Sequence, residues 1–433
     1  MNKRVNLMVA STVGTTLEWY DFFAFAMCAV LVFDKLFYNT ADPFMATLLA
    51  LGTFAAGFLA RPLGGIIFGI LGDKIGRKHV LVVSLLMMGF GTFAVGLLPT
   101  YETIGIAAPI LLLVLRIVQG IAVGGEATGA ILIISESMPS HQRAFWTSFT
   151  MFAGPLANVL AAMVILIVQR IYGDQGFLEW AWRIPFFLSA LLVFLGFWTR
   201  RKVEESPEFI AIKSKREHVE HAPLKESFVT SWRRMLTAFF LKASENTFLY
   251  IFSTFLVLMA TTYLGFSRGP VMNAILWASL VEVIVVLFAA AAADKFGRRP
   301  ILLIGLGLSA ISSFALFTLK PGETSQTELQ LFVILCLASH GVILGAMAAF
   351  MAELFPTRIR FTALSTSYQL ASVAGGSIAP ILGAILLKVT GSGLAVAIYA
   401  TVMSIPALIA VLRTPETRDN PAVEPDAPAI KAN

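Results

Sequence analysis

Charged residues are scarce in this sequence. Of its 433 residues, 13% are charged and 57% are hydrophobic, and the mean hydropathy is +0.80. An average soluble chain is about 45–50% apolar and about 25% charged, so too few polar side chains are present here to cover a water-soluble particle. Twelve membrane-spanning helices of about 20 residues each would need roughly 240 residues, which this composition can supply. The composition therefore excludes a soluble enzyme and predicts a polytopic membrane protein.

Cysteine and the motifs of cofactor chemistry are also scarce. Only Cys28 and Cys336 are present, each inside an apolar run, which excludes a disulfide framework and a cysteine metal site. The sequence holds no P-loop, no cluster of metal ligands and no nucleophile constellation, so we expect neither ATP-driven transport nor an enzyme, and no cofactor. The net charge of +6 lies in short breaks between apolar runs, which indicates membrane orientation and not nucleic-acid binding.

Twelve apolar runs divide the chain into two groups of six, with a polar stretch between them. The sequence predicts an all-α membrane protein with domains at 1–199 and 232–413, a cytoplasmic linker at 200–231 and a disordered tail at 414–433. The runs lie near 7–35, 45–71, 79–99, 104–134, 144–169, 182–199, 235–263, 272–293, 300–318, 329–351, 361–388 and 392–412.

The distribution of Lys and Arg over the loops predicts how the chain is oriented. If both termini are inside, the loops on the cytoplasmic side hold 18 basic residues and those on the other side hold six. Such a bias over short loops places both termini in the cytoplasm. The expected location is the bacterial inner membrane, with the lipid bilayer as surroundings.

The chain also repeats itself. GDKIGRK at 72–78 recurs as ADKFGRR at 293–299, so that Asp73 and Asp294 are 221 residues apart. Glu136-x-x-Pro139-x-x-x-Arg143 recurs as Glu353-x-x-Pro356-x-x-x-Arg360, at an offset of 217. Both offsets are close to half the chain length. Parallel repeats of this kind are typical of transporters whose two halves rock around a central site.

Further motifs accompany the repeats: Arg116-x-x-Gln119-Gly120, Glu18-Trp19-Tyr20-Asp21-Phe22, Arg61-Pro62-Leu63-Gly64-Gly65, Gly124-Gly125-Glu126, Trp180-x-Trp182-Arg183-Ile184-Pro185-Phe186, Glu204-Glu205-Ser206-Pro207 and Pro415-Glu416-Thr417. With them the chain resembles a major facilitator superfamily transporter over essentially its whole length, and within it the metabolite:proton symporters. The resemblance implies two six-helix bundles around a central cavity, and transport of shikimate, α-ketoglutarate, citrate, or proline and betaine with protons. Ala127-Thr128 stands where that family commonly has Trp-Gly, which leaves the substrate open.

Ionisable residues inside the apolar runs are the candidate functional residues. A charge at the bilayer centre costs about 2.5–3.5 kcal/mol even on a lenient scale. In the resembled fold, helices 1, 4, 7 and 10 line the cavity, and most of these residues lie there. The candidates for substrate or proton binding are Glu18, Tyr20, Asp21, Arg61, Arg116, Gln119, Glu126, Lys242, Glu245, Tyr250, His340, Tyr368 and Gln369; Glu282 is a further intramembrane acid.

Spacing suggests how these groups interact. Glu18 and Asp21 are three residues apart and share a helical face, as do Lys242 and Glu245. Two carboxylates on one low-dielectric face cannot easily both ionise, so one is expected to hold a proton. Arg116 offers a planar set of donors suited to a substrate carboxylate. Each of these charges could instead form a fixed ion pair between helices, and His340 could be a hydrogen-bonded packing residue.

The repeated loop motifs predict a gate. Asp73 and Asp294 lie at helix ends, where a carboxylate can cap a neighbouring helix. We expect Arg77 with Glu136 and Arg143, and Arg298 with Glu353 and Arg360, to form charge networks at the cytoplasmic face. Such networks would lock the inside shut in one state and break in the other.

The function predicted from these features is proton-coupled uptake of a small polar metabolite, most simply an organic acid, by a monomer that works by alternating access. A symporter of a zwitterion such as betaine or proline is an alternative, because the intramembrane acids suit a cationic group as well. A proton-coupled exporter of the drug-antiporter type is a second alternative. That class resembles a Gly-Pro-x-x-Gly-Gly element in helix 5, and Gly154-Pro155 here lacks the two trailing glycines.

Overall fold

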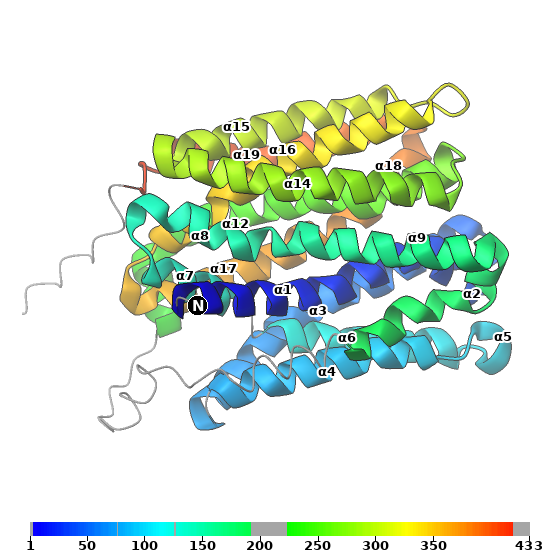
Figure 1. Cartoon of the computed structure of the whole chain (residues 1–433), viewed down its shortest axis with the longest axis horizontal. Coiled ribbons are helices and arrows are strands. Elements are labelled where there is room, and N and C mark those ends of the chain that lie inside the picture. The colour runs from blue at the N-terminus through cyan, green and yellow to red at the C-terminus, as the bar shows by residue number, and fades with distance from the viewer. Residues whose placement is uncertain (1–2, 76, 125–126, 192–222, 419–433) are drawn as a thin grey trace, which may run out of the picture.

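The computed structural model describes residues 3–75, 77–124, 127–191 and 223–418. Within these ranges, side chains are not described at 3–11, 69–75, 77–81, 127, 130, 133, 137, 223–226, 316–317 and 357–358. Every regular element in the described ranges is a helix. The long helices lie side by side along the longest axis of the molecule (Figure 1).

Helices of the first half follow the predicted apolar runs with several breaks. Helix α6 and helix α7 share one predicted run, 104–134, and Phe152 interrupts the run at 144–169 between α8 and α9. Helix α9 extends beyond that run and bends at Gly173, which has φ of 69°. The elements are α1 (Lys3–Cys28), η1 (Ala29–Phe33), α2 (Asp34–Leu36), α3 (Pro43–Ile75), α4 (Arg77–Leu97), α5 (Tyr101–Ile104), α6 (Ala107–Gly124), α7 (Ala127–Ser137), η2 (Ser140–Gln142), α8 (Arg143–Met151), α9 (Ala153–Glu179) and η3 (Ala181–Arg183), then helical residues 184–191.

Helices of the second half begin inside the predicted linker. Residues 200–222 of that linker lie outside the described residues, while 223–231 form the start of α12 and end at Ser231, where the backbone is non-helical. Of the predicted tail, 414–418 are described. The elements are α12 (Pro223–Tyr250), η4 (Ile251–Phe255), α13 (Leu256–Leu258), η5 (Met259–Tyr263), α14 (Arg268–Phe296), α15 (Arg298–Ser313), η6 (Phe314–Phe317), α16 (Gln326–Glu353), α17 (Thr357–Ser372), η7 (Val373–Ser377), α18 (Ile378–Thr390) and α19 (Gly393–Arg413).

Each of the twelve predicted runs has a helical counterpart in the described residues. Nine of these segments are long and apolar enough to cross a membrane, and Val82–Leu97 and Ala181–Leu191 are shorter apolar helices. Helix α15 with η6 corresponds to the remaining run. Large apolar side chains such as Phe90, Phe288 and Val389 are more than two-thirds exposed, whereas Arg116 and His340 are fully buried. This inverted distribution of polarity suits a protein surrounded by lipid.

Glycines let α3 and α6 approach closely. A Cβ atom added at Gly120 would meet the backbone carbonyl group of Gly57, and one at Gly124 would meet that of Arg61. Small residues at such positions allow two membrane helices to pack backbone against backbone. This packing fixes where Arg61 and Arg116 lie relative to each other.

Gly120→Ala is expected to destabilise the protein by about 1–3 kcal/mol, because the added methyl group forces two backbones apart. Gly52→Ala on α3 is the matched control: a Cβ there meets no described residue within 4 Å, and alanine favours a helix by up to about 1 kcal/mol. Thermal unfolding in detergent should show a lower Tm for Gly120→Ala only. An equal Tm for both variants would mean that the close approach of α3 and α6 is not needed.

Candidate functional site

Two adjoining cavities lie between the helices of the two halves. The first is lined by Glu18 and Arg61. The second is lined by Lys242 and Glu245 together with His340. Both cavities share a further set of lining residues: Trp19 of α1, Thr150 and Met151 of α8, and Tyr368 of α17. Cavity-lining charges therefore come from both halves of the chain, as alternating access requires.

Phe22 separates two arginines in the first half. The guanidinium carbon of Arg61 lies 4.3 Å from the centre of the Phe22 ring, and that of Arg116 lies 4.0 Å from it. Arg116 also contacts the rings of Phe25 and Phe54, at 4.3 Å and 5.0 Å. Aromatic rings attract cations by their quadrupole. Arg61 lines the cavity, and Arg116 lies behind the ring.

Asp21 is linked to Arg116 by a chain of hydrogen bonds. The Thr92 hydroxyl donates to Oδ2 of Asp21 at 2.8 Å and accepts from Nε2 of Gln119 at 2.8 Å. Oε1 of Gln119 in turn accepts from Nη1 of Arg116 at 3.0 Å. Nε and Nη2 of Arg116 have no hydrogen-bond partner among the described residues. The polar chain runs across α1, α4 and α6, and all its members are buried.

Glu18 and Asp21 have different surroundings although they share a helical face. Glu18 lines the first cavity and interacts electrostatically with Arg61, whereas Asp21 accepts a hydrogen bond from Thr92 of α4. Packing of α4 against α1 separates the two environments. Glu126, a candidate for substrate or proton binding, lies outside the described residues, and its role stays a prediction.

In the second half, four charged or ionisable side chains form a buried chain. Nζ of Lys242 lies 2.6 Å from Oε2 of Glu245, and Oε1 of Glu245 lies 3.3 Å from Nε2 of His340. Nδ1 of His340 lies 2.5 Å from Oε1 of Glu282. Nζ of Lys242 also lies 4.5 Å above the ring of Tyr368. The i,i+3 spacing predicted the first contact, and the fold adds the other two.

The remaining predicted residues lie at helix contacts. The Tyr20 hydroxyl donates to the carbonyl oxygen of Pro185 at 2.9 Å, and Nε2 of Gln369 donates to that of Gly124 at 2.9 Å. Tyr250 packs edge-on against Phe54 and Phe58, and its buried hydroxyl makes no hydrogen bond within the described part of the chain. Tyr20 therefore points away from both cavities.

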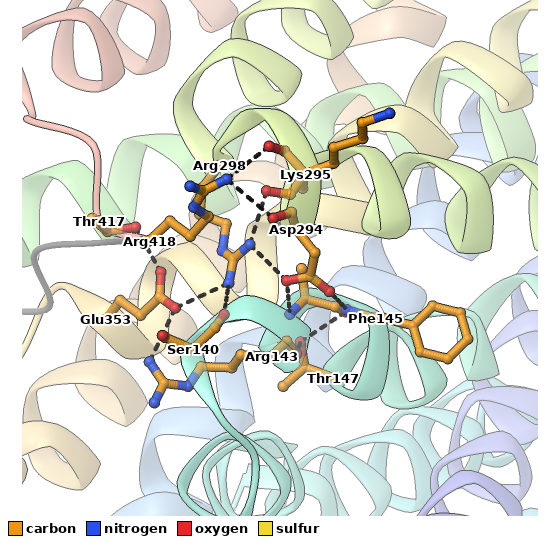
Figure 2. A network of polar contacts seen from close by, with 12 residues as sticks. Ser140, Arg143, Phe145, Thr147, Asp294, Lys295, Arg298, Glu353, Thr417 and Arg418 are labelled. Carbon is orange, nitrogen blue, oxygen red and sulfur yellow. Dashed lines mark hydrogen bonds and ion pairs between the residues drawn. The ribbon is translucent and has the colours of Figure 1, made fainter.

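At one end of the bundle, Glu353 joins the two halves (Figure 2). Its Oε1 lies 3.0 Å from Nη1 of Arg143 and 3.4 Å from Nη2 of Arg298, and its Oε2 accepts from the Thr417 hydroxyl at 2.7 Å. Arg298 also binds Asp294 at 2.7 Å. We call Arg143, Asp294, Arg298, Glu353 and Thr417 the charge network.

Asp294 caps a helix of the other half, as its position at a helix end suggests. Its two oxygens accept from the backbone N–H groups of Ala144 and Phe145 at 3.1 Å and 2.8 Å, at the first turn of α8. A carboxylate there is stabilised by the helix dipole. Asp73 and Arg77, the corresponding residues of the first repeat, lie outside the described side chains, and their contacts stay a prediction.

The ion pairs of the repeated Glu-x-x-Pro-x-x-x-Arg motifs cross between the halves. Nη1 of Arg360 lies 3.0 Å from Oε1 of Glu136, and Arg143 binds Glu353. Of the network expected for Arg298, Glu353 and Arg360, the contact of Arg298 with Glu353 is present at 3.4 Å, whereas Arg360 binds Glu136 of the other half. In place of Arg360, Glu353 binds Arg143. The two motifs face each other across the interface of the halves, so each acid meets the other repeat's arginine.

Sequence reasoning did not predict the contacts of three contributors. Thr92 carries no charge and gives no signal in its helix. Glu282 is visible as an intramembrane acid, but only the packing of α14 on α16 brings it to His340. Glu416 caps α15 through the backbone N–H groups of Arg298 and Arg299, at 2.8 Å and 3.0 Å; its Pro-Glu-Thr motif marked the position without indicating the contact.

The opposite end of the bundle is held by weaker contacts. Nζ of Lys388 lies 3.4 Å from Oδ2 of Asp42, and Nη1 of Arg268 lies 3.9 Å from Oδ1 of Asp174. Three of these four side chains are about half exposed. The Phe44 backbone N–H, which donates to Asp42, holds the pKa of that carboxyl below its usual range. Exposed pairs of this kind contribute about 0–1 kcal/mol each.

The family models that match this chain and its known relatives are all described as transporters. The family model described as "Sugar (and other) transporter" matches residues 6–227, and the one described as "Major Facilitator Superfamily" matches residues 247–432. The inner membrane metabolite transport protein YhjE of Escherichia coli (strain K12) is 39% identical, over 96% of each chain. The chain belongs to the major facilitator superfamily. It is a multi-pass membrane transporter and not an enzyme.

Other members of the superfamily are similar over most of the chain. The Escherichia coli (strain K12) proline/betaine transporter is 34% identical, over 96% of this chain and 84% of its own. The shikimate transporter of the same organism is 34% identical over 90% of each. A solved structure of the proton:xylose symporter XylE has a TM-score of 0.75 at 19% identity, over 96% of each chain, and that similarity concerns the fold.

Proposed function

We propose that this transporter is a proton-coupled symporter that takes up a small organic acid, a metabolite whose carboxylate gives it a net negative charge. The observation that carries the proposal is the pair of cations in the adjoining cavities: Arg61 from the first half and Lys242 from the second. Each cation has an acid beside it, Glu18 or Glu245. An anion bound between the two cations would compete with these acids for the positive charge.

Asp21 is the proton carrier of the first half in this proposal. Its carboxylate is buried, accepts from Thr92 and connects to Arg116 through Gln119. Arg116 does not line either cavity and reaches the substrate region only through the Phe22 ring that it shares with Arg61. A change in the charge of Asp21 would therefore act on the cavity through the position of Arg116 and Phe22.

A zwitterion is the second candidate substrate, because relatives include proline/betaine transporters and aromatic side chains line the cavities. Aromatic cages recognise quaternary ammonium groups. Here, however, the faces of Phe22 and Tyr368 already hold the protein's own cations, Arg61 and Lys242. A further cation would have to displace them, which favours an anionic group.

The proposed location is the bacterial inner membrane, with both termini and the charge network on the cytoplasmic side. The name of the similar protein YhjE, an inner membrane metabolite transport protein, supports the location in the inner membrane. The excess of Lys and Arg in the loops at the end that holds the charge network supports the orientation. In this orientation the charge network closes the cytoplasmic side, and the pairs of Lys388 and Arg268 lie on the outside.

Purified protein in liposomes tests the function. With an acidic outside medium, shikimate should accumulate above its outside concentration, and a protonophore should abolish the accumulation. Proline and glycine betaine are compared under the same conditions, and liposomes without protein are the control. Accumulation of glycine betaine alone would overturn the assignment to an organic acid with a net negative charge, and accumulation that survives the protonophore would overturn proton coupling.

A further inference from the structure

The buried chain Lys242–Glu245–His340–Glu282 alternates in charge from end to end, and we call it the tetrad. Its three links measure 2.6 Å, 3.3 Å and 2.5 Å. All four side chains are 1–2% exposed. Three helices contribute to it: α12 supplies Lys242 and Glu245, α14 supplies Glu282 and α16 supplies His340.

Net charge and hydrogen-bond geometry together indicate that the tetrad holds a proton on the imidazole of His340. With a neutral imidazole and both carboxylates ionised, the four groups would carry one net negative charge in a membrane-embedded interior, where an uncompensated charge is costly, so the tetrad has to hold one further proton. With a protonated imidazole, two cations alternate with two anions and the net charge is zero. Both ring nitrogens of His340 face carboxylate oxygens, and only the protonated ring can donate to both.

The surroundings of His340 add no competing charge in the described part of the chain. Glu282 faces it from α14, and Glu245 and Lys242 face it from α12. Tyr368 of α17 lines the same cavity, as do Thr150 and Met151 of α8, and α15 contributes Ser312, which bonds to Ser339. The other charged groups that bind α16, Arg143 and Arg298, do so at Glu353, about 20 Å along the helix.

The tetrad meets the second cavity at its Lys242 end. Lys242, Glu245 and His340 line the second cavity, while Glu282 is not among its lining residues. An anion in the cavity can reach Lys242 and would compete with Glu245 for the ammonium group. Oε2 of Glu245 would then lose its contact with Lys242, and the imidazolium of His340 would be the only cation of the tetrad left to balance the charges of Glu245 and Glu282.

We propose that the tetrad is a second proton-binding site, in the C-terminal half, which takes up a proton when an anion binds Lys242. The proton comes from a hydronium ion in the cavity: one of its O–H bonds breaks to leave water, and an O–H bond forms at the Glu245 oxygen released by Lys242. Anion and proton thus bind together and leave together. The proposal rests on the proposed function, and with Asp21 it makes the transporter a carrier of two protons for each substrate molecule.

Proton uptake on binding tests the proposal, with shikimate as the probe. Purified protein in weakly buffered detergent solution is mixed with shikimate, and a pH indicator reports the protons taken up per molecule bound. The wild type should take up about two, Asp21→Asn about one, and Asp21→Asn with Glu245→Gln about none. In Asp21→Asn, the affinity for shikimate should fall by up to about tenfold for each unit by which the pH is raised. Adding Glu245→Gln should remove this dependence on pH.

Glu323→Gln is the matched control, because Glu323 is 73% exposed and pairs with Lys320; it should bind protons and shikimate as the wild type does. If Asp21→Asn alone removes all proton uptake, the tetrad is structural and the proposal fails while the proposed function stands. If the wild type binds shikimate without protons, the proposed coupling itself fails.

A measurement without substrate keeps the proposal testable if a variant does not fold or shikimate does not bind. In protein labelled with ¹⁵N-histidine, the His340 resonances are assigned by their loss in His340→Gln. The imidazole should be protonated at pH 7 in the wild type and neutral in Glu282→Gln with Glu245→Gln. A neutral His340 in the wild type at pH 7 would overturn the proposal whatever the transport assays show.

Discussion

Asp21→Asn is expected to lower the steady-state accumulation of shikimate about 100-fold at an imposed gradient of two pH units. Each coupled proton contributes one factor equal to the proton concentration ratio, and a tenfold ratio corresponds to about 1.4 kcal/mol. Asparagine can keep the hydrogen bond to Thr92, but it cannot bind and release a proton. Binding should survive, because Asp21 does not line either cavity.

The measurement uses proteoliposomes whose membrane potential is clamped at zero, so that only the pH gradient drives uptake. Exchange of labelled for unlabelled shikimate at equal pH reports binding and turnover without proton coupling, and it should be retained. Glu323→Gln is again the control. Equal accumulation by Asp21→Asn and the wild type would assign Asp21 a structural role and leave the first half without its proton carrier.

Glu353→Gln is expected to shift the transporter strongly toward states that are open to the cytoplasm. Glu353 is 1% exposed and binds Arg143 from the other half, together with Arg298 and Thr417. Removing one partner of a buried ion pair costs about 3–5 kcal/mol, and only the closed cytoplasmic side contains this pair between the halves. At about 3 kcal/mol, the ratio of closed to open molecules falls by more than 100-fold.

Glu136→Gln provides the comparison within the same interface. Its pair with Arg360 also joins the two halves, but Glu136 is 39% exposed, and such pairs contribute about 0–1 kcal/mol. The shift should therefore be several-fold at most. The shift in each variant can be measured with Met151→Cys as a probe, in a background with Cys28→Ala and Cys336→Ala. The rate at which this cysteine is modified from the cytoplasmic side, in inside-out vesicles, should rise steeply in Glu353→Gln and little in Glu136→Gln. Equal rates in the two variants would contradict a gate centred on Glu353.

Local spacing predicted contacts that lie within one helix. Lys242 and Glu245 were expected on one face, and their atoms lie 2.6 Å apart; Arg116 and Gln119 behave likewise at 3.0 Å. Helical geometry alone places residues three apart in reach of each other. The same rule grouped Glu18 with Asp21, yet they have different partners, because a neighbouring helix offers Thr92 to only one of them.

Contacts between different helices could not be predicted from the sequence. The repeated motifs predicted charge networks at one end, with the members grouped within each half. The contact of Arg298 with Glu353 lies within one half as expected, but the pairs of Glu353 with Arg143 and of Glu136 with Arg360 cross to the other half. A repeat reveals that two segments are alike and says nothing about which surfaces meet. The partners of His340, Thr92 and Glu416 were hidden for the same reason.

The sequence by itself determined that this is a membrane transporter of twelve apolar runs in two related halves, because hydrophobic length, loop charge and repeat offset are properties of the chain read in one dimension. The tertiary structure alone decided that Arg61, and not Arg116, faces the cavity, and that Lys242, Glu245, His340 and Glu282 form one chain of charges. Both depend on how closely three or more helices pack and on which ring or carboxylate a neighbouring helix presents. No spacing along a single chain encodes those distances.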